Sequence, residues 1–169
     1  GRAFAGTITD VSASGNVSAD ELVGGVVGFT SVSITNATAS GNVTGSDIVG
    51  GIAGENSRRI INATALGDVT GSDNVGGVVG LNDGTIRDVD ASGNVTGSTK
   101  VAGIVGTNEG ITANASSSGI VAGNNTVGGA VGFNDYGLVA NVTASPTINN
   151  SEDVGSLIGD NDGSLRQQF

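Results

Sequence analysis

Apolar and small residues recur along this chain with one fixed period, which is much longer than the period of a helix or a strand. The run Val-Gly-Gly-Val-Val-Gly, in close variants, starts at Val23, Val49, Val75, Val101, Val127 and Val154. Successive starts are 26 residues apart, except for the last pair, which is 27 apart. We place the extra residue near Tyr136. A fixed period of roughly 20 to 50 residues indicates a stack of repeated structural units.

Each repeat contains three β-like runs separated by turn residues. The runs are Val-Gly-Gly-Val-Val-Gly, Ile-x-Asn-Ala-Thr-Ala and Asn-Val-Thr. The turns are an Asn-acid-Gly triplet such as Asn82-Asp83-Gly84, a Gly-Ser-Asp triplet at Gly71, and the glycine of Ser-Gly-Asn at Gly93. Asn and Gly tolerate the left-handed backbone that tight turns need. The pattern predicts an all-β chain, a single-stranded β-solenoid of about six 26-residue coils with three short strands per coil.

Stacking of the coils would bury the apolar columns. Equivalent residues of successive coils would lie about 4.8 Å apart, with backbone hydrogen bonds along the rod axis. Three columns are expected inside the rod: Val43, Val69, Val95 and Val121; Ile34, Ile60 and Ile86; and Ala39, Ala65 and Ala91. An α-helical solenoid is disfavoured, because Gly, Thr, Val and Asn are poor helix formers.

We interpret residues 1–169 as one β-solenoid domain. It starts with an incomplete coil at 1–22, continues through coils at 23–48, 49–74, 75–100, 101–126 and 127–153, and ends with an incomplete coil at 154–169. The chain does not begin with Met and contains no signal peptide, so we expect a mature or excised fragment.

The two ends of the chain favour self-association. Neither end resembles a capping helix, and an open terminal coil presents an unpaired sheet edge. End-to-end contacts between copies are therefore expected, with Phe4 and Phe169 placed to seal the joint. A piece cut from a longer rod would have the same open ends.

Two adjacent apolar residues follow the double glycine of each coil, or the pairs Ala102-Gly103 and Gly155-Ser156 that replace it in two coils. Neighbouring strand residues point to opposite faces, so one of the two would face outward and form an apolar stripe for lateral contacts. The candidates for this stripe are Val26, Ile52, Val78, Ile104 and Leu157. The alternative is a glycine-permitted bulge that turns both residues inward.

Composition excludes several classes of partner. The formal net charge is −10, which argues against nucleic acid or an anionic membrane, because both are bound mainly through Lys and Arg. The absence of Cys removes disulfides and thiolate metal sites. No run of roughly 18 apolar residues is present, so membrane insertion is not expected. The low aromatic content, 3%, fits a narrow core of Val, Ile and Ala.

The repeat resembles the GLUG-motif repeat family. The resemblance rests on segments such as Gly76-Gly77-Val78-Val79-Gly80, Asn82-Asp83-Gly84, Ile86-Arg87-Asp88 and Gly93-Asn94-Val95-Thr96-Gly97. It implies an extracellular or cell-surface location, since the family occurs in long bacterial and archaeal surface proteins, including adhesins, and has no family-wide catalytic residues. Two corners depart from the pattern: Asn56-Ser57-Arg58-Arg59 lacks the glycine, and Phe29-Thr30-Ser31 lacks the asparagine.

Candidate chemistry is sparse, and we expect no enzyme. The chain has no His, so a Ser-His nucleophile is excluded in its usual form. An acidic column, Asp83, Glu109, Asp135 and Asp162, follows one corner. Glycoside hydrolysis needs two carboxylates in different environments across a cleft, whereas a column repeats one environment. The same residues are weak candidates for Ca²⁺ binding, against a solvated acidic edge; no other cofactor is expected.

Asparagine is abundant, and two roles are predicted for it. The column Asn82, Asn108, Asn134 and Asn161 is expected to form an amide ladder at the corner. Asn-x-Ser/Thr sequons, which can carry glycan in exported proteins, occur at Asn16, Asn36, Asn42, Asn62, Asn94, Asn114, Asn124, Asn141 and Asn149. Copying of one repeat also generates such sequons without selection for glycan.

These observations favour an extracellular structural or adhesive rod, in its most specific form a filament subunit. Its partners would be other copies of the chain, or a host or neighbouring-cell surface. The alternative is a ligand-binding module for ice or glycan within a larger adhesin. Thr44, Thr70 and Thr96 align as an ice-binding column would, but Ala122 interrupts the column.

Overall fold

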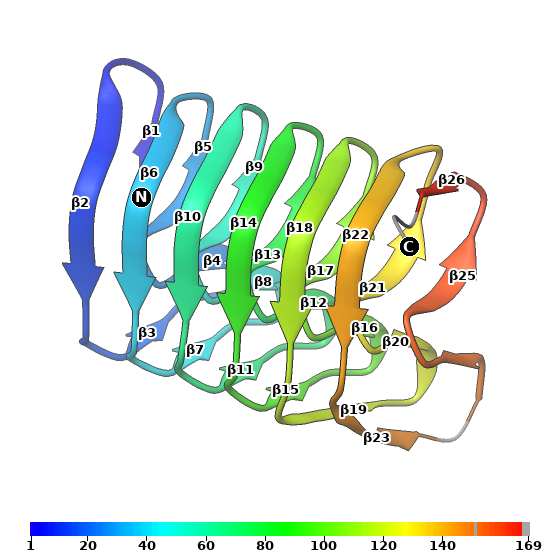
Figure 1. The fold of residues 1–169 in the computed structure, drawn as a ribbon. Helices are drawn as coiled ribbons and strands as arrows, with labels where there is room; N and C mark the ends of the chain where they lie inside the picture. Colours follow the sequence, from blue (N-terminus) through cyan, green and yellow to red (C-terminus); the bar gives the residue numbers. More distant parts are fainter. Residues whose placement is uncertain (151, 167–169) are drawn as a thin grey trace.

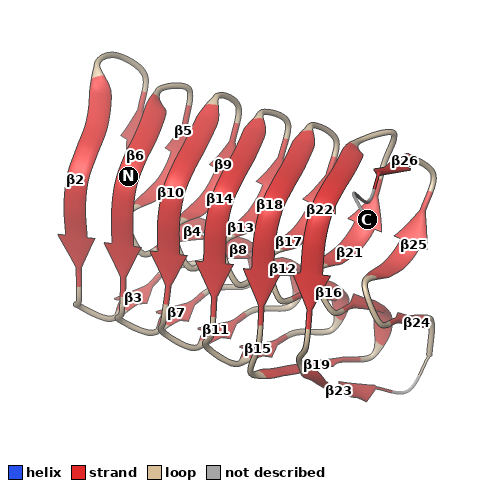
Figure 2. Cartoon of the chain, viewed as in Figure 1, coloured by secondary structure: helices blue, strands red, loops and turns tan. Residues whose placement is uncertain are grey.

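The computed structural model describes residues 1–150 and 152–166. Over these residues every regular element is a β-strand and none is a helix (Figure 2). The chain winds in successive coils, and each strand pairs in parallel with the equivalent strand of the next coil (Figure 1). The predicted fold class, an all-β solenoid of about six coils, is therefore confirmed.

Two seven-stranded sheets form the longer walls of the rod. Sheet A contains β1 (Arg2–Ala3), β5 (Val27–Thr30), β9 (Ala53–Asn56), β13 (Val79–Asn82), β17 (Val105–Asn108), β21 (Val131–Asn134) and β25 (Ile158–Asn161). Sheet B contains β2 (Thr7–Ala13), β6 (Ser33–Ala39), β10 (Arg59–Ala65), β14 (Thr85–Ala91), β18 (Ile111–Ser117), β22 (Leu138–Ala144) and β26 (Ser164–Arg166).

Two six-stranded sheets complete each coil. Sheet C contains β3 (Val17–Ser18), β7 (Val43–Thr44), β11 (Val69–Thr70), β15 (Val95–Thr96), β19 (Ile120–Gly123) and β23 (Thr147–Asn150). Sheet D contains β4 (Glu21–Gly24), β8 (Asp47–Gly50), β12 (Asp73–Gly76), β16 (Thr99–Ala102), β20 (Asn125–Gly128) and β24 (Val154–Gly155). A coil thus follows the order B, C, D, A, as in β6, β7, β8 and β9.

The coil has four strands, so the prediction of three is wrong in this detail. The Val-Gly-Gly-Val-Val-Gly run forms two strands, one in sheet D and one in sheet A, with a bulge between them. At this bulge the N–H groups of Val78 and Val79 both donate to the carbonyl of Ile104, at 2.9 and 3.0 Å. Two adjacent donors on one acceptor turn both side chains the same way. Val78 and Val79 are accordingly both fully buried.

The same bulge rules out the outward apolar stripe. Ile52, Val78 and Ile104 have no exposed surface, whereas Val26, in the first full coil, and Leu157, in the last incomplete coil, are half-buried and pack against the core. The stripe prediction is wrong, and the alternative of a bulge is confirmed. Glycine is required here, because a Cβ on Gly51 would lie 2.3 Å from the carbonyl oxygen of Gly77 in the next coil.

A second irregularity recurs in six of the seven strands of sheet B, β2 through β22. In β10, Ile60, Ala63 and Ala65 are all buried, although strict alternation would place Ile60 on the opposite face from the two alanines. Asn62, between Ile60 and Ala63, has φ +55° and faces outward, which shifts the alternation by one residue. Asn and Asp tolerate this left-handed conformation better than other non-glycine residues. The column with this conformation is Asp10, Asn36, Asn62, Asp88, Asn114 and Asn141.

The interior is divided into two parallel apolar columns. Sheets A and B enclose the larger cluster, which includes the predicted Ile and Ala ladders, and sheets C and D enclose a smaller cluster of Val residues. Sheets A and D approach closely at the boundary between the two clusters: a Cβ on Gly80 of sheet A would lie 2.7 Å from the backbone nitrogen of Val49 of sheet D. The predicted interior columns are confirmed, since each of their members is buried.

The extra residue of the fifth coil lies where it was expected. Asn108 pairs with Asn134, 26 residues later, but Ile111 pairs with Leu138, 27 residues later. The insertion therefore falls between Asn134 and Leu138. Tyr136 lies there with φ +56° and 82% of its surface exposed.

Candidate functional site

The asparagine column at the corner between sheets A and B forms the predicted amide ladder. The Nδ2 atoms of Asn56, Asn82, Asn108 and Asn134 each donate to Oδ1 of the next asparagine in the column, at 2.7 to 2.8 Å, and the last acceptor is Asn161. Asn56 through Asn134 are fully buried. The ladder includes Asn56, although its corner lacks glycine. These amides are bound to one another and support the corner.

The acidic column lies directly outside this ladder. Asp83, Glu109 and Asp162 are exposed and Asp135 is half-buried. They occupy successive coils along one edge, as their neighbours Asn82 and Asn108 do, and do not face each other across a cleft. In the described part of the chain, no three acidic residues are grouped so that they could hold a metal ion. The column therefore has the arrangement of a solvated acidic edge.

Partial burial, and secondly neighbouring charge, raises the pKa of three carboxyls at or beside this edge: Glu55, Asp83 and Glu109. Partial desolvation raises the pKa of Asp83 above its usual range. Desolvation also raises the pKa of Glu109, with further increases from the charges of Asp83 and Asp135 and an opposing effect from Lys100. Glu55, which lies between Phe29 and Leu81 in its column, has its pKa raised mainly by desolvation and then by Asp83. The folded protein thus holds protons on these three carboxyls more tightly than free carboxyls do.

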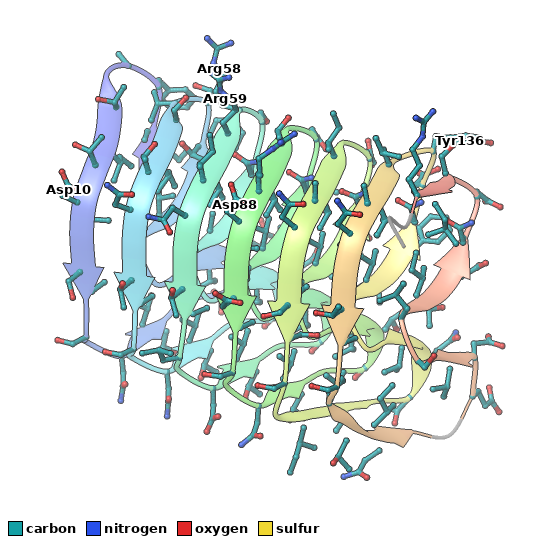
Figure 3. The ribbon with its side chains drawn as sticks, in the orientation of Figure 1. Asp10, Arg58, Arg59, Asp88 and Tyr136 are labelled. Atoms are coloured by element: carbon teal, nitrogen blue, oxygen red, sulfur yellow. The ribbon has the colours of Figure 1, made fainter. Side chains whose placement is uncertain are left out.

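One coil reverses the charge of this edge. Where the next coils present Asp83 and Gly84, this coil presents Ser57 and Arg58, followed by Arg59. Arg58 and Arg59 project from the rim of the rod at the turn between β9 and β10 (Figure 3). A shallow hollow of about 350 Å³ is lined by Ser57, Arg58 and Arg59. In a strongly acidic protein the two arginines form a local concentration of positive charge.

The sequon asparagines lie at the surface. Eight of the nine are exposed, and Asn141 is half-buried. Four of them, Asn36, Asn62, Asn114 and Asn141, belong to the left-handed column of sheet B, where side chains hydrogen-bond from coil to coil. The remaining five lie on sheet C or at its corners: Asn16, Asn42, Asn94, Asn124 and Asn149. This outer ladder was not predicted; its only sequence signal is the recurrence of Asn or Asp two residues after Ile34 and its equivalents.

The threonine column of sheet C is present but short. Thr44, Thr70 and Thr96 pair in register and are exposed, and Thr96 then pairs with Ala122. The rank is one residue wide, because each strand of sheet C is only two residues long in these coils. Of the two residues expected to seal an end-to-end joint, Phe4 is 66% exposed and its ring centroid lies 5.4 Å from that of Phe29. Phe169 lies outside the described residues.

Comparison with known proteins agrees with this architecture. The model of the GLUG motif matches residues 19–44 and 71–96. No curated protein and no solved structure matches the chain. Across the described residues, no helix is long and apolar enough to span a membrane. The two matches fall in equivalent parts of coils that the structure stacks in register, and they confirm the resemblance noted in the sequence: the chain is a β-solenoid repeat protein that carries the GLUG motif.

Proposed function

We propose that this chain is a non-catalytic structural or adhesive rod on the outside of the cell, and that its most specific role is that of a subunit which stacks head to tail into a surface filament. The observation that carries the proposal is the repetition itself. Each wall of the rod presents the same kind of residue in consecutive coils, such as Thr44, Thr70 and Thr96, so surface groups form ranks and do not converge on one point.

The two end coils supply the surfaces for stacking. Ile8 and Val11 of β2 are only half-buried, and Val154 and Leu165 near the other end are 52% and 53% exposed. These residues continue columns that are buried in the middle of the rod; Leu165, for example, pairs with the buried Val139. A second copy would cover them and pair the open backbone edges. Such a contact is heterologous, and heterologous contacts that do not close a ring propagate as filaments.

The charge pattern of one edge supports an adhesive role. Arg58 and Arg59 lie at one end of an edge whose following coils carry Asp83 and Glu109. Complementary charges of this kind orient a partner surface and accelerate encounter more than they add affinity. The net charge of −10 opposes contact between copies at low ionic strength, so association should be measured at about 0.15 M salt or above.

The alternative, a ligand-binding module, is favoured by one observation. The hollow lined by Ser57, Arg58 and Arg59 presents two guanidinium groups that would suit the carboxylate or sulfate of an acidic glycan. Ice binding has less support, because the threonine rank is narrow and ends at Ala122. Titration with an acidic oligosaccharide would test this alternative, with R58Q/R59Q as the variant expected to lose binding.

Two measurements test the main proposal. When intact cells of the organism that makes this protein are treated with a protease or a biotinylating reagent, the protein should be cleaved or labelled. A protein that is protected from both reagents would contradict the extracellular location. Sedimentation velocity of the purified chain should show association that increases with concentration. A single monomer species at every concentration would contradict the filament role and leave only the structural or adhesive rod.

A further inference from the structure

The nine sequons differ in what the side-chain amide nitrogen does, although their sequences are alike. In the sheet-B ladder the nitrogen is already in use. Nδ2 of Asn36 donates to Oδ1 of Asp10 at 2.9 Å, and Nδ2 of Asn62 donates to Oδ1 of Asn36 at 2.7 Å. Asn114 and Asn141 donate in the same direction, to the residue of the preceding coil, at 3.0 and 3.3 Å. All four nitrogens are therefore directed along the rod, toward the neighbouring coil.

At the corner between sheets B and C the amide is oriented the other way. Oδ1 of Asn16 accepts the backbone N–H of Asn42 at 2.9 Å, and Oδ1 of Asn42 accepts the N–H of Asp68 at 3.1 Å. Oδ1 of Asn94 accepts the N–H of Ile120 at 3.0 Å. The oxygen is held against the next coil, so the nitrogen, on the other branch of the planar amide, is left for solvent. Among the described residues Nδ2 of Asn16, Asn42 and Asn94 has no hydrogen-bond partner.

The two remaining sequons resemble this corner group. Asn124 lies at the turn between β19 and β20, at the other corner of sheet C, and Asn149 lies on β23 of the same sheet. Both are exposed, and neither side-chain amide is bonded to another described residue. The five asparagines with an uncommitted nitrogen thus all lie on or beside sheet C.

N-linked glycan is attached through this nitrogen. A glycosyl donor activated as a lipid-linked or nucleotide-linked phosphate transfers its sugar: the anomeric carbon forms a bond to Nδ2, the bond from that carbon to the phosphate oxygen breaks, the phosphate leaves, and the amide nitrogen gives up one proton. A sugar on Asn16, Asn42 or Asn94 leaves the hydrogen bond of its Oδ1 in place, and, among the described residues, the side chains of Asn124 and Asn149 have no such bond to lose. A sugar on a ladder asparagine would have to fit beside a nitrogen that contacts the neighbouring coil, at a spacing of about 4.8 Å.

We propose that the N-glycosylation sites of this protein are the five sheet-C asparagines, Asn16, Asn42, Asn94, Asn124 and Asn149, and that the four ladder asparagines stay unmodified. This inference rests on the proposed extracellular location. The glycans would then cover sheet C and its two corners. The outer face of sheet B and the acidic edge would remain bare. Asn16 precedes β3 and Asn149 lies on β23, which are the two edge strands of sheet C, so sugar would also flank the ends of the rod at this sheet. The terminal strands of sheets A and B, where stacking is proposed, would stay free of sugar.

Glycopeptide mapping by mass spectrometry, on protein isolated from the organism that makes it, tests this assignment. Sugar is expected on the peptides of the five sheet-C asparagines and none on those of the four ladder asparagines. The matched variants change only the sequon and leave each asparagine in place. T44A/T96A should lower the intact mass by two glycans, because it removes the sequons of Asn42 and Asn94. T38A/T64A, which removes the ladder sequons of Asn36 and Asn62, should leave the glycan mass unchanged.

The outcomes separate this inference from the proposed function. A protein that is accessible on intact cells but carries sugar on a ladder asparagine, or none at the five sheet-C sites, overturns the inference alone. A protein that is inaccessible on intact cells overturns the proposed location and the inference with it.

Discussion

The side-chain amide of Asn82 donates to Oδ1 of Asn108 at 2.8 Å, and both residues are completely buried. The pair is one step of a ladder that runs through the corner of the rod. Asn suits the position because its side chain donates and accepts at once, so each member satisfies the one before it and the one after it. Asp could accept but not donate, and Leu could do neither.

Replacing Asn108 by Ala should therefore destabilise the rod by about 3 kcal/mol, since it leaves the buried amide oxygen of Asn134 and the hydroxyl of Thr112 without their partners. Urea unfolding followed by circular dichroism measures the loss. Asn161→Ala is the matched control: Asn161 is exposed at the end of the ladder, and its loss should cost about 1 kcal/mol. Equal costs at the two positions would contradict the ladder as a buried element.

Replacing Val95 by Asp tests the smaller apolar column. Val95 is completely buried among the valines of sheets C and D, where a carboxylate would have no cationic partner. We expect a loss of about 3 to 5 kcal/mol in the free energy of unfolding. Thr96→Asp places the same charge on the adjacent, exposed residue and should change stability little. Similar melting of both variants would mean that Val95 does not lie inside.

The columns could be predicted from the sequence because each is a run of like residues at one period. Val95 and its equivalents remain apolar in consecutive coils, and only an interior position explains that. The bends could not be predicted in the same way. Ile48 has φ +51° and Lys100 has φ +52°, although neither residue type favours the left-handed region. The stacking of equivalent coils imposes this conformation on them, so local preference gives no signal.

The candidate sites illustrate the same difference. The buried asparagine ladder could be predicted, because one residue type repeats at the same turn, as in Asn82. The orientation of each sequon amide could not be predicted. Asn42 and Asn62 have the same Asn-x-Thr sequence and differ only in which side-chain atom contacts the neighbouring coil. The outward stripe was predicted wrongly, since strict alternation was assumed across a bulge at residues such as Val78.

Stability should decrease as pH rises through the range in which Glu55, Asp83 and Glu109 titrate. The pKa values of Glu55, Asp83 and Glu109 are raised in the folded protein, whereas the unfolded chain has ordinary values. Between the two values the folded state binds more protons, so the free energy of unfolding falls with increasing pH and becomes level above the raised values. Urea titrations at a series of pH values measure this slope.

Asp83→Asn provides the control for the pH series, because it removes one titrating group and one of the charges that act on Glu55 and Glu109. The slope should become shallower in this variant. Stability that rises with pH over the same range would contradict the raised pKa values.

A charge on the open edge should prevent stacking without unfolding the rod. Leu165, which is 53% exposed in the last coil, can be replaced by Lys with little loss of buried surface. We expect Leu165→Lys to abolish association in sedimentation velocity and to leave the melting temperature within about 2 °C of the original. Leu66→Lys makes the same change at a site that is 47% exposed in the middle of the rod, and should associate normally. Normal association of both variants would exclude this edge from the contact.

Electron microscopy of the purified chain at about 0.15 M salt tests the central claim most directly. Six stacked coils at about 4.8 Å each give a subunit length of about 30 Å. Head-to-tail stacking predicts uniform filaments one rod wide, with an axial repeat near this value or slightly less where end coils interlock. Monodisperse single rods at high protein concentration would contradict filament assembly.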